Sequence, residues 1–146
     1  MVNHSLDTKA GDETLSNHDD LTVPCLKTDK LMKLEDELNK YDVILINEAQ
    51  FFDDLYDLVN RLLFRNKTIY IGGLDGDYER KKFGQILDLI PLCDKVTKLT
   101  SLCAICKNGK QGLFSLRMAK NIQKQILIDE TQYMPVCRSC YDLYNL

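Results

Sequence analysis

The sequence lacks an excess of positive charge. Its 146 residues carry 19 lysines and arginines against 22 aspartates and glutamates, which gives a formal net charge of −3. A protein that holds nucleic acid through phosphate contacts normally shows a basic surplus, and no basic stripe interleaved with aromatic residues stands in for one here. The composition therefore argues against nucleic acid as a partner.

Long apolar runs are also missing. No run approaches the roughly 20 residues that a membrane-spanning helix needs, and the chain does not open with a charged stretch followed by an apolar one. Internal repeats and low-complexity tracts are likewise missing. We therefore expect a cytoplasmic protein without a membrane partner, whose hydrophobic content of 45% is enough to build a packed core.

The hydrophobic spacing alternates between strand and helix periods. The expected elements are a polar loop at 1–24, a helix at 28–40, a strand at 43–46, a helix at 52–63, a strand at 67–73, a charged loop at 74–84, a short helix at 85–92 and a third strand at 95–103. The apolar runs of the strands are typical of strands buried on both faces. Strands separated by helices imply right-handed crossovers and a parallel sheet, so the expected fold class is α/β.

Four of the six cysteines form two C-x-x-C pairs, Cys103 with Cys106 and Cys137 with Cys140. Two such pairs can complete a tetrahedral four-sulfur shell around one Zn²⁺, and the bound metal would stabilise a segment with few apolar residues. The alternative is a redox-active or unpaired set of thiols, although a thioredoxin-type motif needs only one pair. We predict a structural zinc site, in a lobe at 99–146 that follows an α/β domain at 1–98.

Glu48 stands directly after the expected strand at 43–46, preceded by Asn47. Ligands of open α/β sheets bind at the carboxyl ends of the strands, and the loop at 74–84 follows the next strand onto the same edge. A solvated loop carboxylate would look the same in isolation. Phe51 and Phe52, however, could wall an apolar pocket beside it, so we predict a site centred on Glu48.

Four segments carry a resemblance to a known family. They are NEAQFFDDL (47–55), GLDGDYERKKFG (73–84), KLTSLCAIC (98–106) and YMPVCRSCY (133–141). In this order they resemble the zinc-containing cellular and poxviral type of thymidine kinase, where the segments read approximately DEGQFF, ALDGTFQRKPFG, KLTAVC-x-x-C and Y-x-x-VCR-x-CY. The resemblance runs from about residue 3 to residue 141. It implies a P-loop-NTPase-like (RecA-like) sheet with a zinc-ribbon and lasso lobe.

The resemblance also implies an activity, the transfer of phosphate from ATP to thymidine to give ADP and dTMP in deoxynucleoside salvage for DNA synthesis. Glu48 matches the general base that takes the proton of the 5′-hydroxyl, a role that suits a carboxylate within reach of an alcohol. Asn47 matches an aspartate that supports Mg²⁺. Thymidine and ATP are the implied small-molecule partners, Zn²⁺ and Mg²⁺ are the implied metals, and a homotetramer is the implied assembly.

Other residues match binding positions of the family. The matches for thymidine binding are Phe51, Leu74, Tyr78, Phe83, Lys124, Gln125, Ile126, Leu127, Ile128 and Tyr133. The matches for ATP and Mg²⁺ are Asp7, Thr8, Lys9, Asn47, Glu48, Ala49 and Gln50, with His18 and Asp19 on a neighbouring H-D motif. For the aromatic residues and Leu74, core or surface packing is the alternative interpretation.

The family's phosphate-binding loop, G-x-x-x-x-G-K-[ST], does not occur in these 146 residues. Met1 falls just after the place where the first strand, loop and helix would end, so we expect a sheet without that strand. A truncated copy, an incomplete reading of the gene and a decayed paralogue all fit this departure. We expect residues 1–146 alone to bind ATP weakly. A non-catalytic homologue that binds partners or subunits is the alternative function, and a free-standing zinc-ribbon protein that binds nucleic acid is disfavoured by the charge.

Overall fold

The computed structural model describes residues 1–7, 11, 13–16, 19, 21–118 and 132–144. The chain forms two compact units. Unit 1 comprises Met1–Asp75 and Phe83–Leu92, and unit 2 comprises Gly76–Lys82 and Cys93–Leu146. The predicted domains at 1–98 and 99–146 stay a prediction, although residues 76–82 and 93–98 cluster here with the second unit.

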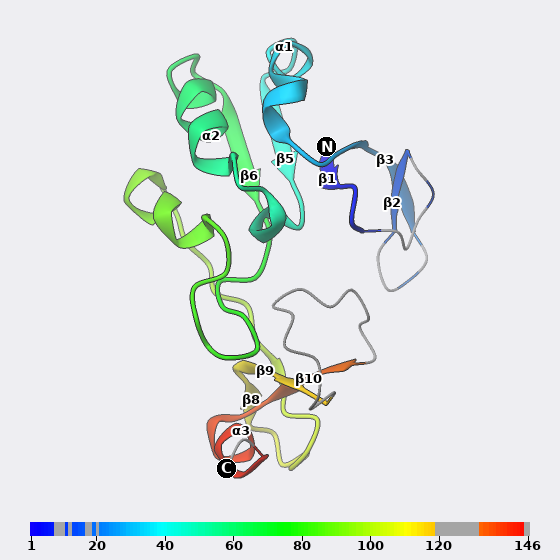
Figure 1. Cartoon of the computed structure of the whole chain (residues 1–146), viewed down its shortest axis with the longest axis vertical. Coiled ribbons are helices and arrows are strands. Elements are labelled where there is room, and N and C mark those ends of the chain that lie inside the picture. The colour runs from blue at the N-terminus through cyan, green and yellow to red at the C-terminus, as the bar shows by residue number, and fades with distance from the viewer. Residues whose placement is uncertain (8–10, 12, 17–18, 20, 119–131, 145–146) are drawn as a thin grey trace. The chain divides into compact units, whose positions relative to one another are not determined.

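Unit 1 contains a four-stranded parallel sheet with the strand order β4-β1-β5-β6. Figure 1 labels β1, β5 and β6 of this sheet. Its strands are β4 (Leu26–Thr28), β1 (Val2–His4), β5 (Val43–Ile46) and β6 (Thr68–Ile71). Val2 lies opposite both Leu26 and Ile46, so β1 pairs on both sides. The predicted α/β class with a parallel sheet is confirmed.

The N-terminal segment does not form the loop predicted for residues 1–24. It contributes β1 to the sheet, and β2 (Thr14–Ser16) pairs with β3 (Thr22–Pro24) in an antiparallel ribbon. The prediction was wrong because β1 contains one apolar residue, Val2, and its strand conformation comes from its two neighbours rather than from its own periodicity.

The helix predicted at 28–40 is shorter and later. Thr28 belongs to β4, the 3₁₀ turn η1 spans Leu31–Leu34, and helix α1 spans Glu35–Leu38. The carboxylate of Asp54 accepts the backbone N–H groups of Leu31 at 3.2 Å and Met32 at 2.9 Å. This long-range cap starts the turn three residues after the predicted start, and local spacing gives no sign of it.

Helix α2 (Leu55–Leu63) lies within the predicted range of 52–63 and supplies much of the core. The buried cluster of unit 1 consists of Val2, Leu31, Leu38, Ile44, Ile46, Ala49, Phe52, Leu55, Leu58, Val59, Leu62 and Leu89. Leu89 comes from the 3₁₀ helix η3 (Ile86–Leu92), at the position predicted for a short helix. Helical and 3₁₀ elements therefore pack on the sheet face that carries Ile44 and Ile46.

The opposite face of β5 is not buried within the described part of the chain. Ile44 and Ile46 are each 2% exposed, whereas Val43 is 53% and Leu45 38% exposed. The prediction of burial on both faces was therefore wrong for this strand. The third strand predicted at 95–103 was wrong too: only β7 (Ser101–Leu102) forms, and it pairs antiparallel with β8 (Gln111–Gly112), outside the parallel sheet.

Unit 2 is built around a second, smaller core. Strand β9 (Phe114–Arg117) pairs antiparallel with β10 (Tyr133–Val136), and helix α3 (Arg138–Tyr144) follows directly. The buried cluster consists of Cys103, Leu116, Val136, Cys137, Cys140 and Tyr141. Half of this core is cysteine. Among the described residues of the whole chain, no helix has the length and hydropathy to cross a membrane.

Candidate active site and metal centre

Glu48 lies at the carboxyl end of β5, where the chain turns into the short 3₁₀ helix η2 (Ala49–Phe51). Its backbone adopts a left-handed conformation, with φ of 50°. Non-glycine residues rarely take this conformation, and when they do it is often at a functional site. The backbone N–H of Ala49 donates to the carbonyl of Gly72 at 3.1 Å, which ties this turn to the segment after β6.

Gln50 fixes the carboxylate of Glu48. Its Nε2 donates to Glu48 Oε2 at 2.6 Å, and its Oε1 accepts the backbone N–H of Leu74 at 3.0 Å. The side chain is only 3% exposed, so both ends of the amide are satisfied inside the protein. The predicted site residues Glu48, Gln50 and Leu74 are thus brought together at one edge of the sheet.

Two glycines leave room for Gln50. A Cβ at Gly73 would lie 2.4 Å from Gln50 Oε1, and a Cβ at Gly84 would lie 2.2 Å from the backbone oxygen of Gln50. Gly84 also has φ of 59°, a conformation that suits glycine. Gly73 directly precedes the charged loop predicted at 74–84 and Gly84 ends it, so both ends of this loop pack closely against η2.

A chain of side-chain amides lies beside Glu48. Asn47 Nδ2 donates to Asn3 Oδ1 at 3.2 Å, and Asn3 Nδ2 donates to Asp7 Oδ2 at 2.8 Å. Lys27 Nζ donates to the backbone oxygen of Asp7 at 2.7 Å. The predicted residues Asp7 and Asn47 are therefore connected through Asn3, which is fully buried on β1 and which sequence reasoning missed.

Aromatic rings pack together near the carboxyl end of β1 and η2. The rings of Phe51 and Phe83 meet edge to face, with centroids 5.6 Å apart. His4 contacts Phe51 at 5.6 Å and Phe52 at 4.6 Å, and its Nδ1 accepts the N–H of Leu6. Burial lowers the pKa of His4, which keeps the ring neutral. Sequence reasoning did not single out His4, because nothing local shows that its ring lies against two phenylalanines.

The two predicted tyrosines, Tyr78 and Tyr133, lie in unit 2. The Cζ of Arg117 lies 4.4 Å from the ring centroid of Tyr78 and 5.6 Å from that of Tyr133. The hydroxyl of Tyr141 donates to the backbone oxygen of Tyr78. Arg117 is the residue here that the motifs did not indicate.

Most of the other predicted site residues lie outside the described part of the chain. These residues are Thr8, Lys9, His18, Lys124, Gln125, Ile126, Leu127 and Ile128. Asp19 is described, and it is exposed. The binding roles assigned to all of these positions stay predictions.

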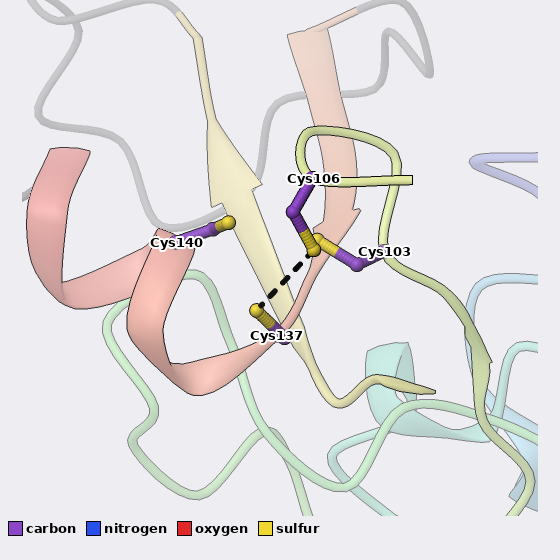
Figure 2. A group of neighbouring side chains, drawn as sticks. All are labelled: Cys103, Cys106, Cys137 and Cys140. Carbon is purple, nitrogen blue, oxygen red and sulfur yellow. Dashed lines mark hydrogen bonds between the residues drawn. The ribbon is translucent and has the colours of Figure 1, made fainter. Parts of the chain in front are cut away.

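The two C-x-x-C pairs come together in unit 2, as Figure 2 shows. Cys103 and Cys106 lie on a turn that follows β7, Cys137 lies between β10 and α3, and Cys140 lies in α3. All four sulfur atoms lie within 4.8 Å of one another, and none is in a disulfide. A tetrahedron with metal–sulfur bonds of about 2.3 Å has edges of about 3.8 Å, so only small shifts are needed to close the shell.

Local backbone geometry shapes the first turn. The N–H of Cys103 donates to the carbonyl of Lys110 at 2.8 Å, which closes the turn, and the N–H of Ala104 donates to Pro135 at 2.9 Å, which joins it to β10. Gly109 has φ of 83°, a conformation that is unfavourable for residues with a Cβ atom. The sequence C-A-I-C-K-N-G therefore presents both sulfurs toward the second pair.

The electrostatics of the cluster favour a bound cation. Burial raises the pKa of Cys103, but backbone amides of Cys137, Cys106 and Ile105 outweigh it and hold that pKa at about 6. Burial and the neighbouring sulfurs raise the pKa of Cys140 to about 12. Four adjacent thiolates therefore cannot form together unless a cation offsets their charge, which is the chemistry of a soft divalent metal site. The four cysteines can hold one metal ion.

Comparisons with known proteins identify the family of this chain. A family model described as thymidine kinase matches residues 1–141. The chain is 40% identical to the thymidine kinase of Oryza sativa subsp. japonica, covering 97% of this chain and 54% of the rice protein, and 40% identical to thymidine kinase a of Arabidopsis thaliana, covering 97% and 61%. It is 35% identical to the thymidine kinase of Sheeppox virus (strain KS-1), covering 98% and 79%. The chain thus spans little more than half the length of the plant relatives. It belongs to the thymidine kinase family.

Proposed function

We propose that the protein containing this chain transfers the γ-phosphate of ATP to the 5′-hydroxyl of thymidine, with Glu48 as the general base. The observation that carries this proposal is the position of Glu48, at the carboxyl end of a parallel strand and oriented by Gln50. Its support is the match of the family model to residues 1–141 and the names of the relatives, each a thymidine kinase.

The chemistry follows from the carboxylate. Glu48 accepts the proton of the 5′-hydroxyl as that oxygen bonds to the γ-phosphorus, and the bond from phosphorus to the β-bridging oxygen breaks to release ADP. The proton then passes from Glu48 to solvent. Asp7 and Asn47 offer the oxygen ligands that Mg²⁺ prefers, and with ATP bound that ion would neutralise charge on the transferring phosphoryl group.

The apolar residues of unit 1 suit a pyrimidine base. The edge-to-face pair of Phe51 and Phe83 offers ring surface, and Leu74 is held next to Gln50. We assign these residues to thymidine binding. Tyr78 and Tyr133, which lie in unit 2, are assigned to it by family resemblance. Residues 124–128 are assigned to the base by family resemblance alone.

The metal centre has a structural role in this proposal. All four ligand positions are cysteine sulfurs, so a tetrahedral Zn²⁺ would keep no open position for substrate or water. The zinc would instead hold together the turn after β7 and the start of α3. We also propose a cytoplasmic, homotetrameric protein without nucleic-acid or membrane partners.

Phosphate binding is the part of the proposal that needs sequence beyond these 146 residues, because they contain no G-x-x-x-x-G-K-[ST]. A P-loop-NTPase-like fold without that loop would lack its anion-binding backbone amides and lysine. We therefore propose that residues 1–146 alone bind ATP·Mg²⁺ too weakly for efficient transfer.

The test compares residues 1–146 with a chimera in which the segment that precedes the matching region of the sheeppox thymidine kinase is fused before Met1. Calorimetry should give micromolar ATP·Mg²⁺ affinity for the chimera only, and the chimera should form dTMP from thymidine. A chimera that binds both substrates and forms no dTMP would contradict the assigned catalytic role. Micromolar ATP binding by residues 1–146 alone would contradict the proposed need for the added loop.

A second candidate function is a non-catalytic homologue that binds nucleoside or partner subunits. Asn47 favours it, because an amide stands where the family resemblance has a Mg²⁺-supporting aspartate, and this amide is engaged with Asn3. The chimera separates the two candidates: thymidine binding without phosphate transfer supports this one.

A further inference from the structure

Arg117 is a buried cation in a small unit. Its side chain is 8% exposed, and its guanidinium lies against two tyrosine rings, with Cζ 4.4 Å from the Tyr78 centroid and 5.6 Å from the Tyr133 centroid. Burying a charge is costly, so such a residue is normally held by specific interactions. Flat guanidinium groups bind favourably to aromatic faces, and burial strengthens this attraction because water no longer screens it.

The strand register brings Arg117 to Tyr133. Arg117 is the last residue of β9 and Tyr133 the first of β10, and the two residues are direct partners across the antiparallel pair. The N–H of Met118 donates to the carbonyl of Gln132 at 2.8 Å, which continues the pairing by one step. Directly opposite residues project from the same face of the ribbon, so Tyr133 and Arg117 are held side by side by backbone pairing.

The backbone of Tyr78 is fixed separately. The carboxylate of Asp77 accepts the N–H groups of Glu79 and Lys81, each at 2.9 Å, while the N–H of Asp77 donates to the carbonyl of Lys81. Tyr141 Oη donates to the backbone oxygen of Tyr78 and so ties this turn to α3. These hydrogen bonds anchor the backbone of Tyr78. The orientation of its ring is set by the contact between the ring face and the guanidinium of Arg117.

We propose that Arg117 is a positioning residue that holds the rings of Tyr78 and Tyr133 in the arrangement that accepts thymidine. This inference rests on the proposed function, which assigns both tyrosines to thymidine binding. Arg117 acts through the rings and not on the reacting atoms. A preformed arrangement avoids the entropy cost of ordering two side chains when the nucleoside binds, so Arg117 should affect thymidine affinity and leave the transfer step unchanged.

The experiment uses the zinc-loaded chimera defined above, in which the sheeppox segment precedes Met1, and thymidine itself as the probe. Arg117→Met removes the charge and planarity and keeps an unbranched apolar stem. Arg117→Lys keeps the charge without the planar group that stacks on both rings. The control is Arg138→Met, which removes a solvent-exposed arginine of the same unit whose Cζ lies 4.8 Å from the Phe114 ring centroid. Zinc content and melting temperature are measured for each variant.

Arg117→Met should raise the KM for thymidine about tenfold, a size typical of the loss of one or two buried cation–aromatic contacts, with kcat and the KM for ATP unchanged. Arg117→Lys should recover part of the loss, and Arg138→Met should behave as wild type. If Arg117→Met loses zinc or fails to fold, Arg117→Lys provides the test. It should also raise the KM for thymidine and leave the KM for ATP unchanged.

Two results would overturn the inference alone: wild-type thymidine KM in the Arg117 variants, or an equal rise in the KM for thymidine and for ATP, which is the signature of general destabilisation. Failure of the proposed function looks different. In that case the wild-type protein neither binds thymidine nor forms dTMP, and the role given to Arg117 falls with it.

Discussion

Gln50 Nε2 donates a 2.6 Å hydrogen bond to Glu48 Oε2, across a turn in which Glu48 itself has a left-handed backbone. The other end of the same amide accepts the N–H of Leu74. The position of the carboxylate is therefore set by the segment that follows β6, and not only by the strand that Glu48 ends. A carboxylate held in this way has little conformational freedom left to lose when a substrate binds.

Glu48→Gln should remove proton acceptance while keeping the shape of the side chain. We expect kcat of the chimera to fall by about 10²–10⁴, the usual contribution of a general base. Thymidine affinity should change little, because the apolar residues Phe51 and Phe83 remain. Steady-state kinetics and calorimetry measure the two effects. Glu37→Gln, at a surface carboxylate that pairs with Lys40 at 2.5 Å, is the matched control. Equal losses in both variants would contradict a specific role for Glu48.

Asn47→Asp should destabilise unit 1 in the absence of Mg²⁺. Asn47 Nδ2 now donates to Asn3 Oδ1, whereas a carboxylate would present an acceptor to an acceptor. Asn3 cannot rotate its amide to donate to the new carboxylate without breaking its hydrogen bond to Asp7. Leaving such polar groups unsatisfied costs about 1–3 kcal/mol of unfolding free energy, measured by denaturant titration.

Mg²⁺ should reverse part of that loss, because the new carboxylate is a better ligand for it than an amide oxygen. Asn39→Asp adds the same charge at an exposed site, where Oδ1 accepts from Arg65 at 2.6 Å, and should not be destabilising. If Asn47→Asp is as stable as wild type without Mg²⁺, the hydrogen bonds from Asn47 through Asn3 to Asp7 do not contribute to the stability of unit 1.

Gly84→Ala should be among the more damaging small substitutions in unit 1. Its φ is 59°, and the new methyl group would lie 2.2 Å from the backbone oxygen of Gln50, which cannot move without moving η2. We expect a loss of about 2–4 kcal/mol from backbone strain and overpacking together. Gly109→Ala shares the positive φ but meets nothing within 4 Å, so about 1 kcal/mol is expected there. Chemical denaturation should show this order, and the reverse order would contradict it.

The elements that sequence reasoning located were those whose evidence is local. The run from Val43 to Ile46 marked β5 to the residue, and helical spacing marked α2. Residues 95–100 also contain β-branched residues, but among the described residues no strand pairs with them, and they are exposed. Strand β1 shows the converse, because its polar sequence becomes a strand between two partners. Pairing partners, which no local window contains, decided both cases.

The candidate site divides in the same way. The four cysteines were indicated by their spacing, Glu48 by its position after a strand, and Gln50 by the family resemblance. Asn3 and Arg117 were missed because each acts through contacts with residues distant in sequence. A buried asparagine or arginine has no spacing of its own that reveals its partner.

Removing the metal should unfold unit 2 while leaving the parallel sheet of unit 1. Half of the buried residues of the small core are cysteines, so little apolar burial remains to hold it. Structural zinc supplies about 10 kcal/mol or more in zinc-finger peptides, which exceeds the stability of most small lobes. We expect a chelator, or Cys140→Ser, to abolish stoichiometric zinc and to collapse the methyl NMR signals of Leu116 and Val136.

Cys93→Ser is the matched control for this prediction, because Cys93 is exposed and outside the four-sulfur cluster. It should retain one zinc per chain by elemental analysis. Full zinc occupancy in Cys140→Ser, or intact unit 2 signals after chelation, would show that the cluster is not the support of this core.

His4 should make the stability of unit 1 depend on pH. Burial lowers its pKa below the ordinary value of 6.5, while three aspartates, Asp29, Asp53 and Asp54, oppose that shift without cancelling it. The unfolded chain therefore binds a proton at a higher pH than the folded chain does. The contribution of His4 to stability is present above pH 6.5 and is lost as the pH falls through the lower folded pKa. His4→Gln removes the titration, so unfolding free energies measured from pH 7.5 to pH 5 should fall more steeply for wild type than for this variant. Parallel slopes would mean that the ring between Phe51 and Phe52 takes up its proton as readily in the folded chain as in the unfolded one.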